Sequence, residues 1–324
     1  MTIKKQLTKL NILVQQYVQT DPIEWRCQLL LINIKPNWPK KVQFLLGLDF
    51  PLIDQLVPRK PFIGGRIGYP KQEIFFWLLI KKTLGLDYRT VSEMAGVAHT
   101  TLIRANDKFS KAMVYQKFLV HLIKLGYKQG LIQGHKVALD SSFVKTYSKR
   151  QELGSGGWNG HKESYGFKLH ALIDAESGIL IALIIGDGLT HDSQVAIPLL
   201  KRARPWLKRC GYVLADKGYD DTKIVEYIAK SLHARAAIPI KKIRRGKNYS
   251  TKGAFQNWKE KAKGRCIKKS IYNKRSEVER FFSTLKRAFK LGKERTRGIK
   301  AFLENTYLAC ICFMLRRLRI AGVV

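Results

Sequence analysis

The segment KVALDSS, residues 136–142, places three apolar residues directly before an aspartate, Asp140. The segment YVLADKG, residues 212–218, repeats the pattern and places Asp216 after a short apolar run. Short apolar runs bounded by polar residues are typical of buried strands, and carboxylates are uncommon inside strands. Each aspartate is therefore predicted to lie where a buried strand leaves a sheet, although a turn-initiating acid is the simpler interpretation of either one alone.

Other segments of the chain share this strand pattern. Strands are predicted at residues 135–139, 166–173, 179–185, 212–215 and 234–240. The first three follow one another closely enough for an antiparallel meander, and a helix near residues 194–204 precedes the fourth. The predicted fold class is therefore α/β, with a mixed sheet flanked by helices.

The chain before about residue 130 has a different periodicity. Its apolar residues recur every three or four positions, as at Leu7, Leu10 and Val14, which indicates amphipathic helices. An all-α part is therefore expected before the sheet. About two domains are expected for 324 residues, and the pattern suggests helical regions at 1–60 and 61–130 before an α/β domain at 131–324.

The composition is strongly basic. The chain has 60 Lys and Arg against 24 Asp and Glu, a formal net charge of +36. Nucleic acid is the polyanion that most commonly neutralises such a charge, and an anionic membrane surface is the lesser alternative. Residues 241–300 alone hold 22 Lys and Arg against 4 Glu. This excess predicts a DNA-binding segment rather than an ordinary solvated face, with contacts from Lys241, Lys242, Arg244 and Arg245.

The cysteines and apolar segments bear on the compartment. Five cysteines are scattered without the spacing of a disulfide or zinc framework, which indicates a reducing environment. The N-terminus lacks the features of a secretory signal. The most apolar run, residues 307–315, is nine residues long and too short to span a bilayer. A cytoplasmic protein of a bacterium-like cell is therefore expected.

Residues 89–109, RTVSEMAGVAHTTLIRANDKF, have the spacing of a helix-turn-helix. A short helix is predicted before a turn at Gly96, where glycine supplies left-handed geometry, and a second helix is predicted from His99. The second helix would direct its outward side chains to base edges in a major groove; these are His99, Thr100, Thr101 and Arg104. A purely structural helical hairpin is the alternative, and the basic composition favours DNA binding.

A third candidate acid lies in YNKRSEVERFFSTLK, residues 272–286. On a helix with about 100° per residue, Tyr272, Arg275 and Lys286 fall within about 40° of Glu279, whereas Glu277 lies about 200° away. An adjoining apolar stripe can pack on the sheet; it consists of Val278, Phe282, Leu285 and Phe289. The alternative is a basic amphipathic helix with incidental charge pairs.

The spacing Tyr272-x2-Arg275-x3-Glu279-x6-Lys286 resembles the signature of the DDE transposases encoded by many bacterial insertion sequences. Asp140 in VALDSS and Asp216 in LADKGYD resemble the first and second acids of that family. Segments 166–170 and 190–192 are also similar to it, so the resemblance runs from about residue 60 to the C-terminus.

The resemblance implies a ribonuclease-H-like core, with the first acid on the first strand, the second after the fourth strand and the third on a later helix. Asp140, Asp216 and Glu279 would hold two Mg²⁺ ions, with Mn²⁺ able to substitute, and would cleave and join phosphodiester bonds. Tyr272, Arg275 and Lys286 would bind DNA phosphates beside the scissile bond.

The same resemblance implies double-stranded DNA as the partner, both transposon ends and target, and a homodimer assembled on DNA. The first helical region, 1–60, is the candidate for dimerisation or end binding, and nucleoid association is expected. Only 62 residues separate Asp216 from Glu279, so the long insertion domain of some relatives is not expected here. His191 and Asp192 follow a predicted strand and have either a site role or a turn role.

Three alternatives remain at this level. A metal-dependent nuclease would cut DNA without joining it, and nothing in the sequence separates it from a transposase. A non-catalytic DNA-binding protein derived from a transposase has no need of intact Asp140, Asp216 and Glu279. An RNA-binding ribosomal-type protein would share the charge without the three acids.

Overall fold

The computed structural model describes residues 38–57, 68–147, 156–160, 162–240, 265, 268–294 and 296–324. They form two compact units, the first ending at Phe118 and the second comprising Leu119–Val323. Most of the predicted N-terminal region 1–60 lies outside the described residues. So do Lys241, Lys242, Arg244 and Arg245 of the basic segment.

The described part of the first unit is helical, which confirms the predicted all-α character. It contains η1 (Lys40–Leu45), α3 (Pro51–Leu56), α4 (Lys71–Leu84), α5 (Tyr88–Ala95), α6 (His99–Lys111) and the start of α7 (Val114–Lys128), which continues into the second unit. Its core is an aromatic cluster around the fully buried Phe75, whose ring lies 5.0 Å from Phe118 and 5.3 Å from Phe50. Aromatic pairs of this kind bury much apolar surface per residue.

The predicted turn between α5 and α6 is present. Gly96 ends α5 with a φ of 62°, the left-handed geometry expected from the sequence, and α6 begins at His99. Asp87 caps α5 by accepting from the backbone amides of Arg89 and Thr90, and the Thr90 hydrogen bond is the main cause of its lowered pKa. Buried Val91, Val97 and Leu102 hold the two helices together.

The second unit is built on one six-stranded sheet: β1 (Lys136–Lys145), β2 (Gly157–Asn159), β3 (Ser164–Asp174), β4 (Leu180–Asp187), β5 (Tyr212–Leu214) and β6 (Arg235–Ala237). β3 pairs antiparallel with β1, β2 and β4, which confirms the meander. β5 pairs parallel with both β1 and β6. The short β2 was not predicted from sequence.

One predicted strand boundary is wrong. Asp140 does not end its strand but lies in the middle of β1, directly opposite Ala171 of β3. The parallel pairing of β1 with β5 stops at Ala138, whereas the antiparallel pairing with β3 continues to Lys145. Asp140 therefore lies just beyond the point where β1 stops pairing with β5, in the part of β1 that still pairs with β3.

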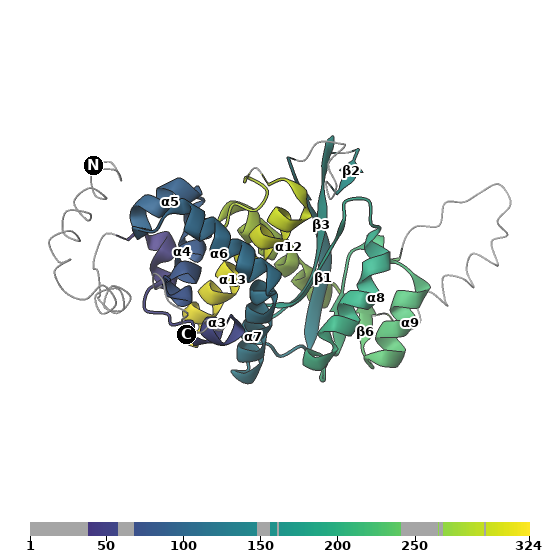
Figure 1. Cartoon of the computed structure of the whole chain (residues 1–324). Helices are drawn as coiled ribbons and strands as arrows, with labels where there is room; N and C mark the ends of the chain where they lie inside the picture. Colours follow the sequence, from purple (N-terminus) through teal and green to yellow (C-terminus); the bar gives the residue numbers. More distant parts are fainter. Residues whose placement is uncertain are drawn as a thin grey trace, which may run out of the picture. The chain divides into compact units, whose positions relative to one another are not determined.

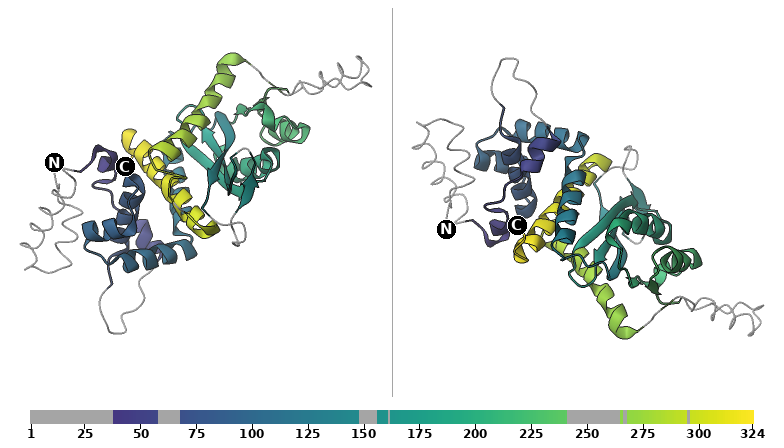
Figure 2. Two further views of the ribbon diagram at one scale, coloured as in Figure 1. Left: turned by 90° about the horizontal axis from the view of Figure 1, so that it is seen from above. Right: turned by 90° about the horizontal axis from the view of Figure 1, so that it is seen from below.

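Helices cover both faces of this sheet (Figures 1 and 2). One face carries α8 (Asp192–Ala203) and α9 (Thr222–Ser231), joined by the short η2 (Arg204–Trp206), β5 and η3 (Lys217–Tyr219). The other carries α12 (Ser276–Arg287), which follows α11 (Lys269–Tyr272) and η4 (Asn273–Arg275), and α13 (Gly298–Ile320). The sheet is thus the central layer of a three-layer unit.

Helix α13 was not predicted as a separate element. It is 23 residues long, and an 18-residue window within it has a mean hydropathy of 1.3, enough by length and composition to cross a membrane. However, 56% of that window is buried inside the protein, including Phe302, Cys310 and Phe313. This burial is typical of the core helix of a soluble domain. The apolar run at 307–315 is the centre of this helix rather than a short isolated run.

Candidate active site

Two of the three predicted acids meet at neighbouring strands. β1 and β5 run parallel, with Lys136 opposite Tyr212 and Ala138 opposite Leu214, so that Asp140 and Asp216 lie at the same level beyond the paired residues. Asp216 caps the start of η3, and its Oδ1 accepts from the backbone amide of Gly218 at 2.6 Å. A side chain at Gly218 would lie within 2.7 Å of that oxygen. The sequence LADKG therefore holds the Asp216 carboxylate in one orientation.

The electrostatics of Asp140 show that negative charges converge there. The pKa of Asp140 is raised to about 6, mainly by burial and in addition by the carboxylates of Asp216 and Asp192. The backbone amide of Ser141, which donates to Oδ1 at 2.8 Å, and the guanidinium of Arg275 oppose this shift. Nearby carboxylates that disfavour each other's charge are stabilised by a cation.

The third acid, Glu279, is linked to Asp140 by an arginine. Arg275 Nη2 donates to Glu279 Oε1 at 2.6 Å, and Nη1 donates to Asp140 Oδ2 at 3.4 Å. The side chain of Arg275 is 20% exposed, whereas that of Glu279 is 54% exposed. One guanidinium therefore bridges an acid from β1 and an acid from α12.

The predicted stripe along a single helix is only partly correct. The chain from Lys269 to Arg287 is α11, a 3-10 turn and α12, so the angles of one continuous α-helix do not apply before Ser276. Tyr272 and Arg275 nevertheless lie together, with the guanidinium 5.8 Å from the centre of the tyrosine ring. Tyr272, Arg275 and Glu279 thus form one group.

Lys286 of α12 binds β1 farther along the strand than Arg275 does. Its ammonium donates to Ser142 Oγ at 2.7 Å and to the carbonyl of Phe143 at 3.2 Å. Burial lowers the pKa of Lys286, and the charge of Lys162 adds to this effect. Because Asp140 and Ser142 point to the same face of the strand, Arg275 and Lys286 approach β1 from the side of α12.

The rest of α12 is as predicted. Val278, Phe282, Leu285 and Phe289 are all buried, and so is Phe281, which the predicted stripe did not include. Glu277 lies apart from Glu279: it pairs with Arg280, and its carboxylate is near Gly178 and Arg317. The helix therefore presents Glu279 and Lys286 to β1 while its apolar side packs on the sheet.

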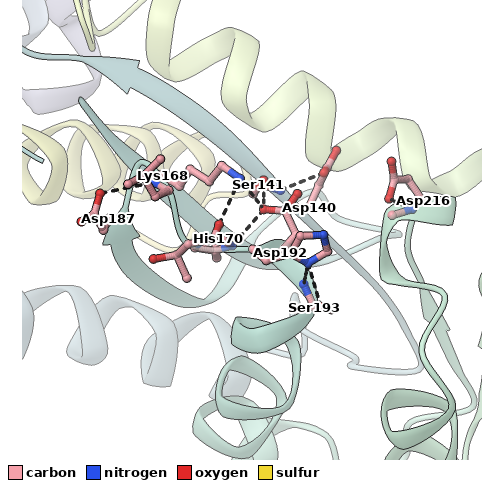
Figure 3. A network of polar contacts seen from close by, with 12 residues as sticks. Asp140, Ser141, Lys168, His170, Asp187, Asp192, Ser193 and Asp216 are labelled. Carbon is pink, nitrogen blue, oxygen red and sulfur yellow. Dashed lines mark hydrogen bonds and ion pairs between the residues drawn. The ribbon is translucent and has the colours of Figure 1, made fainter. Parts of the chain in front are cut away.

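A fourth carboxylate, Asp192, lies close to Asp140 and Ser141, on the face of the sheet opposite α12 (Figure 3). It is the first residue of α8, and it accepts a hydrogen bond from the Ser141 hydroxyl at 2.8 Å. The sequence did not distinguish a site role from a turn role for Asp192. Only the register of β3 on β1, which pairs Ser141 with His170, reveals this contact.

The predicted DNA-reading residues lie on α6. His99, Thr100 and Arg104 are exposed, and Thr101 is half-buried. Ile103, on the same helix, is 45% exposed. One basic residue of the segment before α11 is structural instead: Arg265 is buried against Asp220, 2.5 Å away, and also donates to the carbonyl of Ile238.

The donor chemistry for divalent metal ions is present in part. Asp140 and Asp216 supply hard oxygen ligands from adjacent strands, the type that Mg²⁺ prefers. Glu279 is linked to Asp140 through Arg275. Within the ranges that the structure describes, no three His, Cys, Asp or Glu side chains are close enough to hold a metal ion.

The chain is 29% identical over 149 residues to a protein of Brucella ovis named as a transposase for insertion sequence element IS6501, a match covering 46% of this chain and 98% of the relative. Among solved structures, a piggyBac transposase synaptic complex with hairpin DNA matches with 11% identity and a TM-score of 0.46, covering 83% of this chain and 72% of that one.

A Mos1 mariner paired-end complex with Mn matches with 12% identity and a TM-score of 0.23, covering 94% of this chain and 92% of that one. These scores are too low to carry weight of their own. The strand order and the two acids on adjacent parallel strands are those expected of a ribonuclease-H-like core. Residues 133–315, more than half of the chain and including all three acids, match the model of the transposase DDE domain, so the chain belongs to the DDE transposase family.

Proposed function

We propose that this DDE transposase binds the terminal repeats of an insertion sequence, cleaves the ends by phosphodiester hydrolysis and transfers the resulting 3′-hydroxyl ends to target DNA. The observation that supports this most directly is that Asp216 lies beside Asp140, while Arg275 links Asp140 to Glu279 and Lys286 binds the same strand at Ser142. Acids and phosphate-binding cations at one place are what a phosphodiester substrate requires.

Two Mg²⁺ ions, with Mn²⁺ able to substitute, are the proposed cofactors, held by Asp140, Asp216 and Glu279. Divalent ions supply activation of the attacking oxygen and stabilisation of the leaving oxygen in such sites. The fixed orientation of Asp216, and the hydrogen bond that the backbone amide of Ser141 donates to Asp140, keep two of the carboxylates ready to bind. Glu279 is proposed to join them when Arg275 transfers its hydrogen bonds to a DNA phosphate.

Three side chains are proposed to position the DNA strand. Arg275 and Lys286 would bind phosphates beside the scissile bond by charge-assisted hydrogen bonds, and the Tyr272 hydroxyl would add a third contact. The ring of Tyr272 supports the guanidinium, and Ser142 holds the ammonium near Asp140. These groups orient the strand and exclude alternative positions without taking part in bond making.

End recognition is proposed for α6, whose exposed His99, Thr100 and Arg104, with Thr101, would face base edges in a major groove. Arg104→Ala should weaken binding to the end sequence by about 1–3 kcal/mol and leave non-specific binding nearly unchanged. Competition footprinting against random DNA measures both. Equal weakening of the two would assign Arg104 to the phosphate backbone.

The basic segment is proposed as the channel for the duplex, with contacts from Lys241, Lys242, Arg244 and Arg245. Replacing these four residues with Gln should weaken binding to all sequences. It should also reduce the slope of log affinity against log salt by up to about 0.9 for each lost phosphate contact. An unchanged slope would make the segment an ordinary solvated face.

Assembly as a homodimer on DNA is proposed, because two ends must be cut and joined together, and the protein would act in the cytoplasm at the bacterial nucleoid. The central experiment incubates purified protein with its element's end sequence and Mg²⁺, and maps the products on a sequencing gel. Cleaved and joined strands are expected. Cutting without joining would indicate a nuclease, and binding without cutting would indicate a non-catalytic derivative.

A further inference from the structure

The face of the sheet opposite α12 carries a polar cluster that the proposed chemistry does not use. It consists of Ser141 on β1, Lys168 and His170 on β3, and Asp192 at the start of α8 (Figure 3). Ser141 and His170 are directly paired across the two strands, and Lys168 lies two residues from His170, so all three side chains project to one face.

Asp192 is the centre of this cluster. Its Oδ1 accepts from Ser141 Oγ at 2.8 Å, lies 3.3 Å from the ammonium of Lys168 and lies 3.9 Å from Nδ1 of His170. Burial lowers the pKa of His170 to about 4, so the imidazole is neutral near pH 7 and Lys168 supplies the positive charge. Lys168 is itself fixed by donating to the carbonyl of Thr190 at 3.0 Å.

Ser141 connects this cluster to the acid on the other face. Its hydroxyl is bound to Asp192, while its backbone amide donates to Asp140 Oδ1 at 2.8 Å. A single residue therefore holds one carboxylate with each of its two donors. Because Asp192 is bound to the residue next to Asp140, its negative charge lies close to any cation that Asp140 holds.

We propose that Asp192 is a positioning residue for the reaction at Asp140. Through Ser141 it fixes the orientation of the Asp140 carboxylate, and its negative charge strengthens cation binding by Asp140 and Asp216. This inference rests on the proposed function, because it requires a divalent cation at those two acids. It adds a residue from the α8 face to a site whose other groups come from β1, from the residues after β5 and from the segment α11–α12.

The alternative is that Asp192 only fastens the start of α8 to the sheet. The two roles differ in what they predict for metal binding. A positioning role predicts weaker cation affinity when the charge of Asp192 is removed, even if the fold is intact. A fastening role predicts a lower melting temperature with unchanged cation affinity.

The test measures Mn²⁺ binding to the full-length protein without DNA by isothermal titration calorimetry. Asp192→Asn keeps an oxygen that can accept from Ser141 but removes the charge, and it should weaken Mn²⁺ binding by about tenfold or more, as for other groups that orient metal ligands. Asp187→Asn is the matched control: this exposed residue at the end of β4 accepts from the amide of Leu189, and its variant should bind Mn²⁺ as the wild type does.

Lys168→Met removes a charge of the opposite sign to that removed by Asp192→Asn. It removes a cation from the same cluster, so Mn²⁺ affinity should be maintained or increased, whereas a fastening role predicts no change in affinity for either variant. Thermal unfolding of each variant shows whether it is folded. Weakened binding in both Asp192→Asn and Lys168→Met would overturn the charge argument.

Asp140→Asn separates failure of the inference from failure of the proposed function. If Asp140→Asn binds Mn²⁺ as well as the wild type, the proposed metal site itself is wrong. If Asp140→Asn abolishes binding while Asp192→Asn binds as the wild type does, the site stands and the role of Asp192 is overturned.

Discussion

The two faces of the sheet contribute to the site in different ways. On the α12 face, Arg275, Glu279 and Lys286 come from one short stretch of chain. Arg275 contacts Asp140 directly, Glu279 is held by Arg275, and Lys286 binds Ser142. On the α8 face, Asp192 reaches Asp140 only through Ser141. The residues on the α12 face can be recognised from their spacing in the sequence. Those on the α8 face come from three elements, and they can be recognised only once the register of β3 on β1 is known. The groups proposed to contact DNA can thus be predicted from local sequence, whereas the proposed support of the Asp140 carboxylate depends on pairing between distant segments.

The largest effects are expected from the acids. Asp140→Asn, Asp216→Asn and Glu279→Gln should each reduce cleavage by about 10⁴-fold or more, as removal of essential groups does in other hydrolases. End binding should change little, because the basic surface is intact. Gel assays of cleavage with band-shift measurements of binding decide this.

The matched control for the acids is Glu277→Gln. Glu277 lies on the same helix as Glu279 but pairs with Arg280 and is near Arg317, away from Asp140. It should retain activity. A loss of cleavage in Glu277→Gln as large as that in Glu279→Gln would show that cleavage depends on the integrity of α12 and not on Glu279 in particular.

Smaller effects are expected from the cations on the α12 face. Arg275→Ala and Lys286→Met should lower turnover by about 10²- to 10³-fold, the effect of removing one well-placed donor to a transition state. Affinity for DNA should fall much less. Arg280→Ala, which removes a largely exposed arginine from the same helix, is the control and should be near wild type in turnover. Equal losses of affinity and turnover would place Arg275 and Lys286 in general DNA binding.

The apolar contacts of the two faces should be similar in strength. Phe281 of α12 and Leu199 of α8 are each about 1% exposed. Phe281→Ala should lower the free energy of unfolding by about 3–5 kcal/mol, and Leu199→Ala by about 2–5 kcal/mol. Denaturant unfolding followed by circular dichroism measures both. A negligible effect of either one would show that its helix is packed loosely on the sheet.

The smallest effect concerns an ion-pair group away from the site. Hydrogen bonds from Lys136 and then Lys274 lower the pKa of Glu176. A lowered pKa means that this group contributes stability above its unfolded pKa, near 4.5, and that the contribution disappears as the pH falls through the folded pKa. Because all three side chains are partly exposed, Glu176→Gln should lower the free energy of unfolding at pH 7 by at most about 1 kcal/mol.

Unfolding curves at pH 7 and at pH 3 test this last prediction. The difference between wild type and Glu176→Gln should shrink at the lower pH. A difference that is the same at both values would mean that packing, rather than charge, accounts for it.

Much of this architecture could be predicted from the sequence, because it depends on local patterns. The apolar runs around Val137 and Val213 identify neighbouring strands, and the spacing of Val278, Phe282 and Leu285 identifies the buried side of α12. The position of Gly96 identifies the turn before α6, because glycine has no side chain and therefore adopts the left-handed backbone geometry without strain.

The remaining features depend on pairing between distant segments. The sequence shows where the apolar residues of β1 stop but not that β3 continues to pair with it past Asp140. It also does not show that a 3-10 turn holds Arg275 between Asp140 and Glu279. Asp192 has no local signal beyond following a strand, so its contact with Ser141 could not be predicted.

The late position of α12 and α13 in the chain has a consequence for synthesis on the ribosome. β1 and its acid are made before these helices: Arg275, which links Asp140 to Glu279, lies 135 positions after Asp140, and α13 follows it. Since domains complete their folding only after all their core elements are available, the nascent chain should hold an unfinished core with one sheet face uncovered. We therefore expect a nascent chain to lack the proposed cleavage activity until α12 has emerged from the ribosome and packed on the sheet.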